Sequence, residues 1–198
     1  MKQKNVYRSR YRRKREGKTD YRRRLKLLLS DYPRLVVRSS NRLISAQLIS
    51  YDEKGDQTLA EACSKELAKY GWKGDEDNMA ASFLTGLLLA KKCREKNIKY
   101  DKVVPDAGMH APHKGGKVFA LLMGAAEGGL PVSMGEEVKV EDSAIRMEAL
   151  AEYAASLKQK DKEIYSRAFS RYIERGLDPV DLPNHFDELR NKLGGKVV

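Results

Sequence analysis

The sequence predicts an α/β protein in which helices pack on a mixed sheet that starts with an antiparallel meander of three strands. Two observations predict this class: short β-rich runs separated by turn residues follow one another after residue 33, and helical patterns then alternate with one more short strand. The excess positive charge is confined to the start of the chain, which separates an arm from this core. We expect a basic N-terminal arm (residues 1–33), an α/β core domain (34–130) and a C-terminal helical extension (131–198).

The N-terminal arm carries the charge of the whole protein. Its first 26 positions hold thirteen Lys and Arg residues and two acidic residues, and their net charge of +11 equals that of the complete chain. Such a segment repels itself and has little to bury, so it needs a polyanion, and nucleic acid is the usual one. Arginine outnumbers lysine, and Tyr7, Tyr11 and Tyr21 are interleaved. Arginine makes bidentate hydrogen bonds to phosphate, and tyrosine stacks on unpaired bases, so this composition favours RNA.

The arm also contains Gly17-Lys18-Thr19, which matches the end of a nucleotide-binding P-loop. A P-loop needs a further glycine five positions earlier, where Arg12 stands, and a buried strand before it, where the sequence reads YRSRYRRKRE. Both requirements fail, so the segment is interpreted by its charge. A nuclear-targeting patch and an anionic-lipid patch are the alternatives. No membrane partner is expected, because the arm lacks an apolar face and a lipidation signal.

A short helix is expected at the end of the arm, before the first strand. Thr19 or Asp20 can cap its N-terminus, and Leu25, Leu28 and Leu29 give it an apolar stripe. The Asp-Tyr-Pro sequence that follows ends the helix.

The three strands of the meander follow. Leu35–Val37 and Leu43–Ile49 are β-rich runs joined by a turn at Ser39–Asn41, and a second turn at Gly55 leads to a third strand within QTLAEACSKEL.

The rest of the core is expected to alternate helix and strand. Asp77 or Asn78 caps the helix NMAASFLTGLLLAKKCREKN, whose apolar positions 80, 83, 84, 87 and 88 share one face. A strand at Lys102–Pro105 and the loop DAGMHAPHKGGK precede the helix KVFALLMGAAEGG. The order β-β-β-α-β-α is similar to the ribonuclease-H-like topology.

The extension begins with an acidic loop at residues 131–142 and continues with three expected helices. The first helix starts at Ser143, and the second lies in the segment DKEIYSRAFSRYIERG. The third is LPNHFDELRNKLGG, where Pro183 lies in the first turn.

Catalytic and metal sites have little support. His110 and His113 are the most site-like pair, but a metal would need further ligands, and Cys63 and Cys93 lack metal-ligand spacing. Two lone cysteines instead suit buried thiols in a reducing cytosol. We expect no cofactor and no bound metal.

Two groups of residues leave an enzymatic alternative open. Gly115-Gly116-Lys117 at a helix start could bind phosphate, either of RNA or of a nucleotide. The acidic pairs Glu136-Glu137 and Glu141-Asp142 could hold Mg²⁺, although such runs are more often solvated. A phosphate-handling enzyme or nuclease is therefore the alternative function.

Three blocks of the sequence resemble the archaeal members of the large-subunit ribosomal protein family L-eighteen, the counterparts of the eukaryotic L-five protein. These blocks are RRKREGKTDYRRRLKLL, RLVVRSSNRLISAQLISYDEKGDQTLAEACSKEL and GGKVFALLMGAAEGGLPV. The tail segments YSRAFSRYIERGLDP and DLPNHFDELR resemble the archaeal extension. The resemblance implies a three-layer, ribonuclease-H-like core and a cytoplasmic 5S ribosomal RNA-binding protein of the central protuberance, without enzymatic activity. The implied partners are 5S rRNA, large-subunit rRNA and neighbouring 5S-binding ribosomal proteins.

The resemblance also implies RNA contacts in four segments, whose residue types suit RNA independently: hydroxyls and amides bond phosphate or sugar, tryptophan stacks, and Gly-Lys holds phosphate. The candidate residues are Arg8, Arg10, Arg12, Arg13, Lys14, Arg15, Lys18, Thr19, Tyr21, Arg22 and Arg24 in the arm; Arg38, Ser39, Ser40 and Asn41 in the turn; Trp72 and Lys73; and His110, His113, Lys114, Gly116 and Lys117 in the glycine- and histidine-rich loop.

Overall fold

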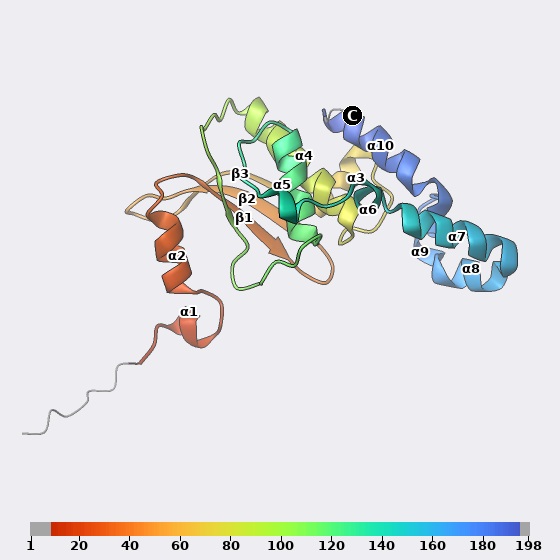
Figure 1. Ribbon diagram of the computed structural model, residues 1–198, viewed down its shortest axis with the longest axis horizontal. Helices are drawn as coiled ribbons and strands as arrows, with labels where there is room; N and C mark the ends of the chain where they lie inside the picture. Colours follow the sequence, from red (N-terminus) through yellow and green to blue (C-terminus); the bar gives the residue numbers. More distant parts are fainter. Residues whose placement is uncertain (1–8, 195–198) are drawn as a thin grey trace, which may run out of the picture.

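The computed structural model describes residues 9–194, and it contains a mixed four-stranded sheet with helices packed on it (Figure 1). The strands are β1 (Arg34–Ser39), β2 (Ile44–Ser50), β3 (Gln57–Cys63) and β4 (Val104–Asp106), in the spatial order β3-β2-β1-β4. β2 is antiparallel to both β1 and β3, whereas β4 is parallel to β1. The α/β class predicted from the sequence is confirmed.

The two faces of the sheet have different surroundings. Alternate side chains such as Leu35, Val37, Ala46 and Leu48 are fully buried and form one face of the core. The opposite face of β2 is half-buried, with polar residues such as Gln47. Helices α4 and α5 make the main helix contacts with the sheet, and the side-chain alternation places them on the buried face.

The longest helix, α4 (Met79–Glu95), is buried on nearly all sides. Asn78 caps it, because its side chain accepts a hydrogen bond from the Ala81 amide at 2.7 Å. The sequence predicted one apolar face, but Ser82, Thr85 and Leu89 are also fully buried. The reason is tertiary: α4 packs on β2 and β3, on α5, and on helices from the C-terminal region.

Helix α5 (Lys117–Glu127) lies directly against α4, and two glycines allow this close approach. A Cβ atom on Gly86 would lie 2.1 Å from the Leu121 carbonyl oxygen, and one on Gly124 would lie 2.0 Å from the Phe83 carbonyl oxygen. Both glycines are therefore required by the separation of the two helix backbones.

The C-terminal region consists of short helices, some of which extend away from the sheet (Figure 1). The helices after α5 are α6 (Asp142–Arg146), α7 (Glu148–Lys160), α8 (Lys162–Ala168), α9 (Ser170–Glu174) and α10 (Leu182–Leu193), with 3-10 turns at Glu136–Val138 and Pro179–Asp181. Earlier in the chain are α1 (Arg12–Arg15), α2 (Tyr21–Leu28), a 3-10 turn at Ser64–Glu66 and α3 (Leu67–Tyr70).

Two of the expected C-terminal helices are each divided into two. The first is interrupted at Met147, whose backbone is left-handed with φ +59°, and the second is interrupted at Phe169. Both interruptions let apolar residues face the same core, since Ile145 is 1% exposed and Phe169 is 6% exposed. Helical spacing alone does not reveal such bends.

Helix α10 fastens the C-terminal region to the core. The rings of Phe83 and Phe186 are 5.6 Å apart, and the buried Arg190 guanidinium lies over the Phe83 ring. Arg190 also donates two hydrogen bonds to Glu127, at 2.8 and 2.6 Å, which raises the pKa of Arg190 further. A buried charge needs such a partner, so this pair fixes how α10 lies against α5.

A second contact joins the core to α10 through Trp72 and His185. Their rings stack with centroids 5.3 Å apart, and the Lys73 amide donates to Nε2 of His185 at 3.2 Å. This bond requires an unprotonated Nε2. Burial lowers the pKa of His185 from its ordinary value of 6.5.

Acidification is expected to weaken this contact. Because the folded pKa of His185 lies below the unfolded one, the stability it contributes is complete above pH 6.5 and is lost as pH falls through the lowered pKa. One such group changes the free energy of unfolding by at most about 1.4 kcal/mol per pH unit. Urea unfolding between pH 7.5 and 5 should show this slope in the wild type and a smaller one in His185→Gln. Equal slopes would contradict the assignment.

Candidate nucleic-acid interface

The described part of the arm folds into two short helices at one side of the sheet (Figure 1). Asp20 caps α2, as expected, by accepting hydrogen bonds from the amides of Arg22 and Arg23 at 2.9 and 3.2 Å. The apolar stripe expected on this helix is largely uncovered, because Leu25 is 60% exposed and Leu29 is 77% exposed. Arg8 lies outside the described residues.

The arm contacts the core through two arginines of α2. Nη1 of Arg23 donates to the Gly108 carbonyl oxygen at 2.9 Å, and Nη2 of Arg24 donates to Oδ2 of Asp56 at 2.8 Å. Arg23 was not among the candidate contacts, although its charge was counted in the arm. The first bond holds α2 beside the loop that follows β4, and the second holds it beside the turn between β2 and β3.

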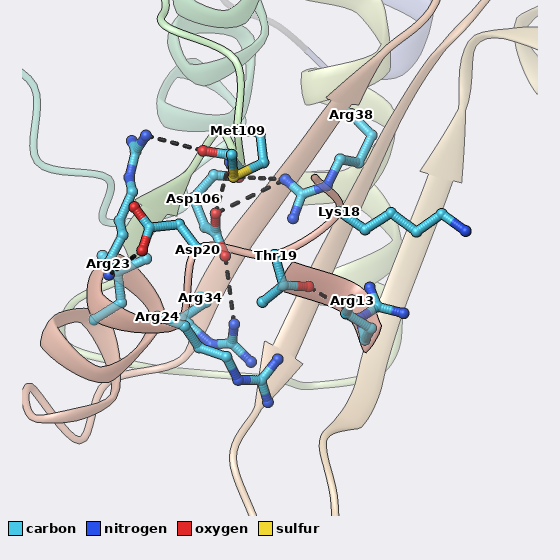
Figure 2. Close-up of a pocket in the computed structure, with 12 residues that line it drawn as sticks. Arg13, Lys18, Thr19, Asp20, Arg23, Arg24, Arg34, Arg38, Asp106 and Met109 are labelled. Atoms are coloured by element: carbon cyan, nitrogen blue, oxygen red, sulfur yellow. Dashed lines mark hydrogen bonds and ion pairs between the residues drawn. The ribbon is translucent and has the colours of Figure 1, made fainter. Parts of the chain in front are cut away.

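A small pocket of about 110 Å³ lies between the arm and the sheet, and we call it the arm pocket (Figure 2). Figure 2 shows its charged side chains converging from three parts of the chain: the arm, β1 and the end of β4. The charged residues that line it are Arg13, Lys18, Arg23, Arg24, Arg34 and Arg38, with Asp20 and Asp106. Six cationic groups and two carboxylates therefore meet in one place.

The centre of the arm pocket is organised by Asp106. This carboxylate is 7% exposed, and it accepts hydrogen bonds from Nη1 of Arg34 at 3.3 Å and from the Gly108 amide at 2.8 Å. Arg38 donates to the Asp106 backbone carbonyl at 3.0 Å, and its Nη1 also lies 3.8 Å from Oδ1 of the carboxylate. The carboxylate and its carbonyl thus engage both arginines of β1.

Arg34 is almost completely buried, with 3% of its surface exposed. Its Nη2 lies 2.8 Å from Oδ2 of Asp56, without the angle of a hydrogen bond. Because Arg24 contacts the same Asp56 oxygen, this carboxylate links the arm to β1.

A second concave surface joins the turn after β1 to the glycine- and histidine-rich loop, and we call it the loop groove. Its volume is about 620 Å³, and its lining includes Ser39–Asn41, Asp77, His110–His113 and Gly116–Val118. The structure therefore brings together two segments that the sequence analysis selected separately. Ser40 closes the turn, because its Oγ accepts a hydrogen bond from the Leu43 amide at 3.1 Å.

The loop groove ends at the N-terminus of α5. Gly116 is the capping residue, and no side chain accepts the free amides of the first turn. Lys117 lies 3.5 Å from Asp77, and the exposed Lys114 lies 3.6 Å from Glu137. These exposed ion pairs are weak, so both lysines can exchange them for phosphate.

The arm pocket and the loop groove are adjacent along two segments. Arg38 of the pocket precedes Ser39 of the groove, and Met109 of the pocket precedes His110 of the groove. β1 and β4 are parallel, so their carboxyl ends lie at the same edge of the sheet. Four arm candidates therefore border the same surface as the turn and the loop: Arg13, Lys18, Thr19 and Arg24. The other described arm candidates line neither hollow, and these are Arg10, Arg12, Lys14, Arg15, Tyr21 and Arg22.

Trp72 and Lys73 are arranged differently. Trp72 is 5% exposed, its ring stacks on His185, and its indole N–H donates to the Asp75 carbonyl at 3.1 Å. A buried ring offers no free face to a base in this conformation. Lys73 is exposed, and its Nζ donates to the Gly176 carbonyl at 3.3 Å.

Other kinds of site have little support in residues 9–194. No three His, Cys, Asp or Glu side chains in this range gather closely enough to hold a metal ion. None of the described helices combines the length and the apolar character needed to cross a bilayer. Cys93 is buried, as expected, and Cys63 is half-buried.

Residues 5–105 match the family described as "Ribosomal large subunit proteins 60S L5, and 50S L18". The chain is also 46% identical over 183 residues to the "Large ribosomal subunit protein uL18" of the archaeon Methanococcus maripaludis, covering 92% of this chain and 93% of that protein. The chain belongs to this family. The resemblance noted in the sequence is confirmed, and the family's role is structural rather than enzymatic.

In this large-subunit ribosomal protein, deletion of residues 1–26 should leave the core folded, because the described residues of that segment include no buried apolar side chain. RNA affinity should fall and become less dependent on salt. If the arm displaces about five to eight counterions, the slope of log K against log salt should lose about 4–7 units. Filter binding at several salt concentrations measures the slope, with circular dichroism to check the fold. A truncated protein with the full slope would contradict this role of the arm.

Proposed function

We propose that this structural constituent of the large ribosomal subunit binds 5S ribosomal RNA and anchors it in the central protuberance. The observation that carries the proposal is the continuous surface made by the arm pocket and the loop groove, beside an arm that holds the chain's whole excess charge of +11. RNA is a polyanion whose phosphates such a surface neutralises. Membership of the ribosomal family supports this choice of nucleic acid.

Each segment of the surface has a different proposed role. The arm candidates neutralise phosphates, and Thr19 also fixes Arg13 by accepting a 2.9 Å hydrogen bond from its Nε. Tyr21 packs against Tyr11 with ring centroids 5.4 Å apart, and together they can support an unpaired base. In the exposed turn, Asn41 can donate to phosphate or sugar.

The loop groove is proposed to hold backbone phosphate through Lys114, Lys117 and the free amides at Gly116, with His110 and His113 as further donors. Lys73 is proposed as a peripheral phosphate contact. Stacking of Trp72 on a base would require its loop to separate from His185, so we place Trp72 in packing.

We further propose that each of the three parts of the chain has its own role. Residues 1–33 act as the RNA-binding arm, 34–130 as the core, whose strand order and α-β alternation support a ribonuclease-H-like topology, and 131–198 as the helical extension. The arm and core also contact large-subunit rRNA. The extension faces neighbouring 5S-binding proteins, for which exposed apolar side chains such as Tyr153 and Ile164 are suitable.

Chemical footprinting of 5S rRNA with the full-length protein tests the proposal. We expect protection of a limited set of nucleotides and co-sedimentation of the protein with large subunits. If the protein protects no nucleotide of 5S rRNA while it binds other RNAs under the same conditions, the 5S assignment is overturned. Multiple turnover of RNA or nucleotide by the wild type would overturn the structural role.

The loop groove can be tested apart from the arm. Lys114→Ala combined with Lys117→Ala should weaken binding to all RNA sequences alike and lower the salt slope by about 2, roughly one per lost phosphate contact. The matched control is Lys160→Ala with Lys162→Ala, which removes the same charge from exposed positions at the α7–α8 junction. If both double variants bind equally, the groove does not contact phosphate.

The turn gives a separate prediction. Replacing Arg38 and Asn41 together with Ala should raise the Kd for RNA about tenfold, because two donors at the junction of the pocket and the groove are lost. Thermal melting should change little, since both side chains are exposed. Equal affinity with an unchanged melting curve would remove the turn from the interface.

A further inference from the structure

We propose that Asp106 is a positioning residue for RNA binding: its buried carboxylate fixes the arginines of the arm pocket, and the pocket takes one backbone phosphate of the bound RNA. This inference rests on the proposed function and names the residue that organises the site. Asp106 carries the same sign of charge as the ligand, so a direct contact with phosphate is excluded as its role.

The charge balance of the arm pocket calls for an anion. Six cationic groups and two carboxylates line it. Asp56, which pairs with Arg24 and Arg34, and Glu16, which pairs with Lys18, add two carboxylates at its border, so a surplus of two positive charges is left. Both lining carboxylates are already engaged: Asp20 caps α2, and Asp106 accepts from Arg34 and from the Gly108 amide. Neither is free to neutralise the other cations. A phosphate supplies the missing negative charge in a form that arginine binds well.

Burial shows that Asp106 holds its neighbours in place. Asp106 and Arg34 are 7% and 3% exposed, and Nε of Arg34 makes no hydrogen bond within the described residues. Without the Asp106 charge, Arg34 would depend on Asp56 alone, and Asp56 is shared with Arg24. Loss of one carboxylate would therefore disturb both the β1 arginine and the contact with the arm.

Gly108 is the point where the three parts of the pocket meet. Its amide donates to Asp106, its carbonyl accepts from Arg23 of the arm, and its backbone has φ +65°. A Cβ atom here would lie 2.8 Å from Cζ of Arg38. Arg38 therefore packs directly against the glycine that Asp106 holds, so the carboxylate sets the position of this half-exposed guanidinium.

A positioning role and a purely electrostatic role of Asp106 predict opposite changes in RNA affinity when its charge is removed. If Asp106 were only a negative charge near RNA, its removal would reduce repulsion and tighten binding. If it positions the arginines, its removal weakens binding, because Arg38 and Arg23 lose the geometry that presents them to phosphate. Asp106→Asn separates the two cases, since it removes the charge and keeps the shape.

The experiment measures the Kd of full-length Asp106→Asn for 5S rRNA at several salt concentrations. We expect a Kd about tenfold higher and a salt slope lower by about 0.7–0.9, as for one lost phosphate contact. The control is Glu16→Gln, which removes an exposed carboxylate of the arm that pairs with Arg12 and Lys18. Its Kd should stay equal or fall. An Asp106→Asn Kd equal to or below that of the wild type would overturn the proposal.

A second variant leaves every charge in place, and it decides the matter if Asp106→Asn fails to fold. Gly108→Ala should displace Arg38 and raise the Kd several-fold relative to Gly129→Ala. Gly129 also has a left-handed backbone, φ +97°, but no atom lies within 4 Å of the added Cβ, and it lines neither the arm pocket nor the loop groove. Both variants therefore place alanine at a positive φ. Equal Kd values for the two alanine variants would overturn the positioning role.

The measurements distinguish the loss of 5S rRNA binding as a function from the loss of the positioning role of Asp106. A wild-type protein without specific affinity for 5S rRNA would overturn the proposed function itself. A wild type that binds normally, beside Asp106 and Gly108 variants that bind as well, would overturn only the positioning role of Asp106.

Discussion

The burial of α4 on nearly all sides is the constraint on which the rest of the structure depends. An apolar helix of this kind is stable only when every face is covered. The sheet covers one face, α5 approaches closely through Gly86 and Gly124, and α10 covers another through Phe186. The C-terminal helices are therefore attached to the same hydrophobic core as the sheet. A neutral, well-packed body results, and it leaves the charged arm outside.

The proposed interface lies at one edge of this body. Because β4 runs parallel to β1, the turn after β1 and the loop after β4 leave the sheet together. The arm docks at this edge through Arg23, whereas Arg24 binds Asp56 at the other end of β1. Cations from distant parts of the sequence are thus concentrated where one rigid scaffold can hold them, which reduces the conformational entropy that RNA binding must overcome.

Two buried arginines form ion pairs that fix the relative positions of secondary-structure elements. Arg34 pairs with Asp106 across the parallel strands, and Arg190 pairs with Glu127 between α10 and α5. Desolvation offsets much of the Coulomb attraction in such pairs, so their net contribution to stability is small. Their effect is to fix the relative placement of elements, because an unpaired buried charge is strongly unfavourable.

The sequence by itself determined the α/β class, a cap of α2 at Thr19 or Asp20, a helix start at Gly115-Gly116-Lys117 and the neutral core beside a charged arm, because local patterns and composition encode these features. Only the tertiary structure decided that Trp72 packs on His185, that the helices bend at Met147 and Phe169, and that Asp106 joins Arg34 and Arg38. These depend on contacts between residues far apart in the chain. The pairing of β1 with β4 brings residues 34 and 106 together, and no local pattern records that pairing.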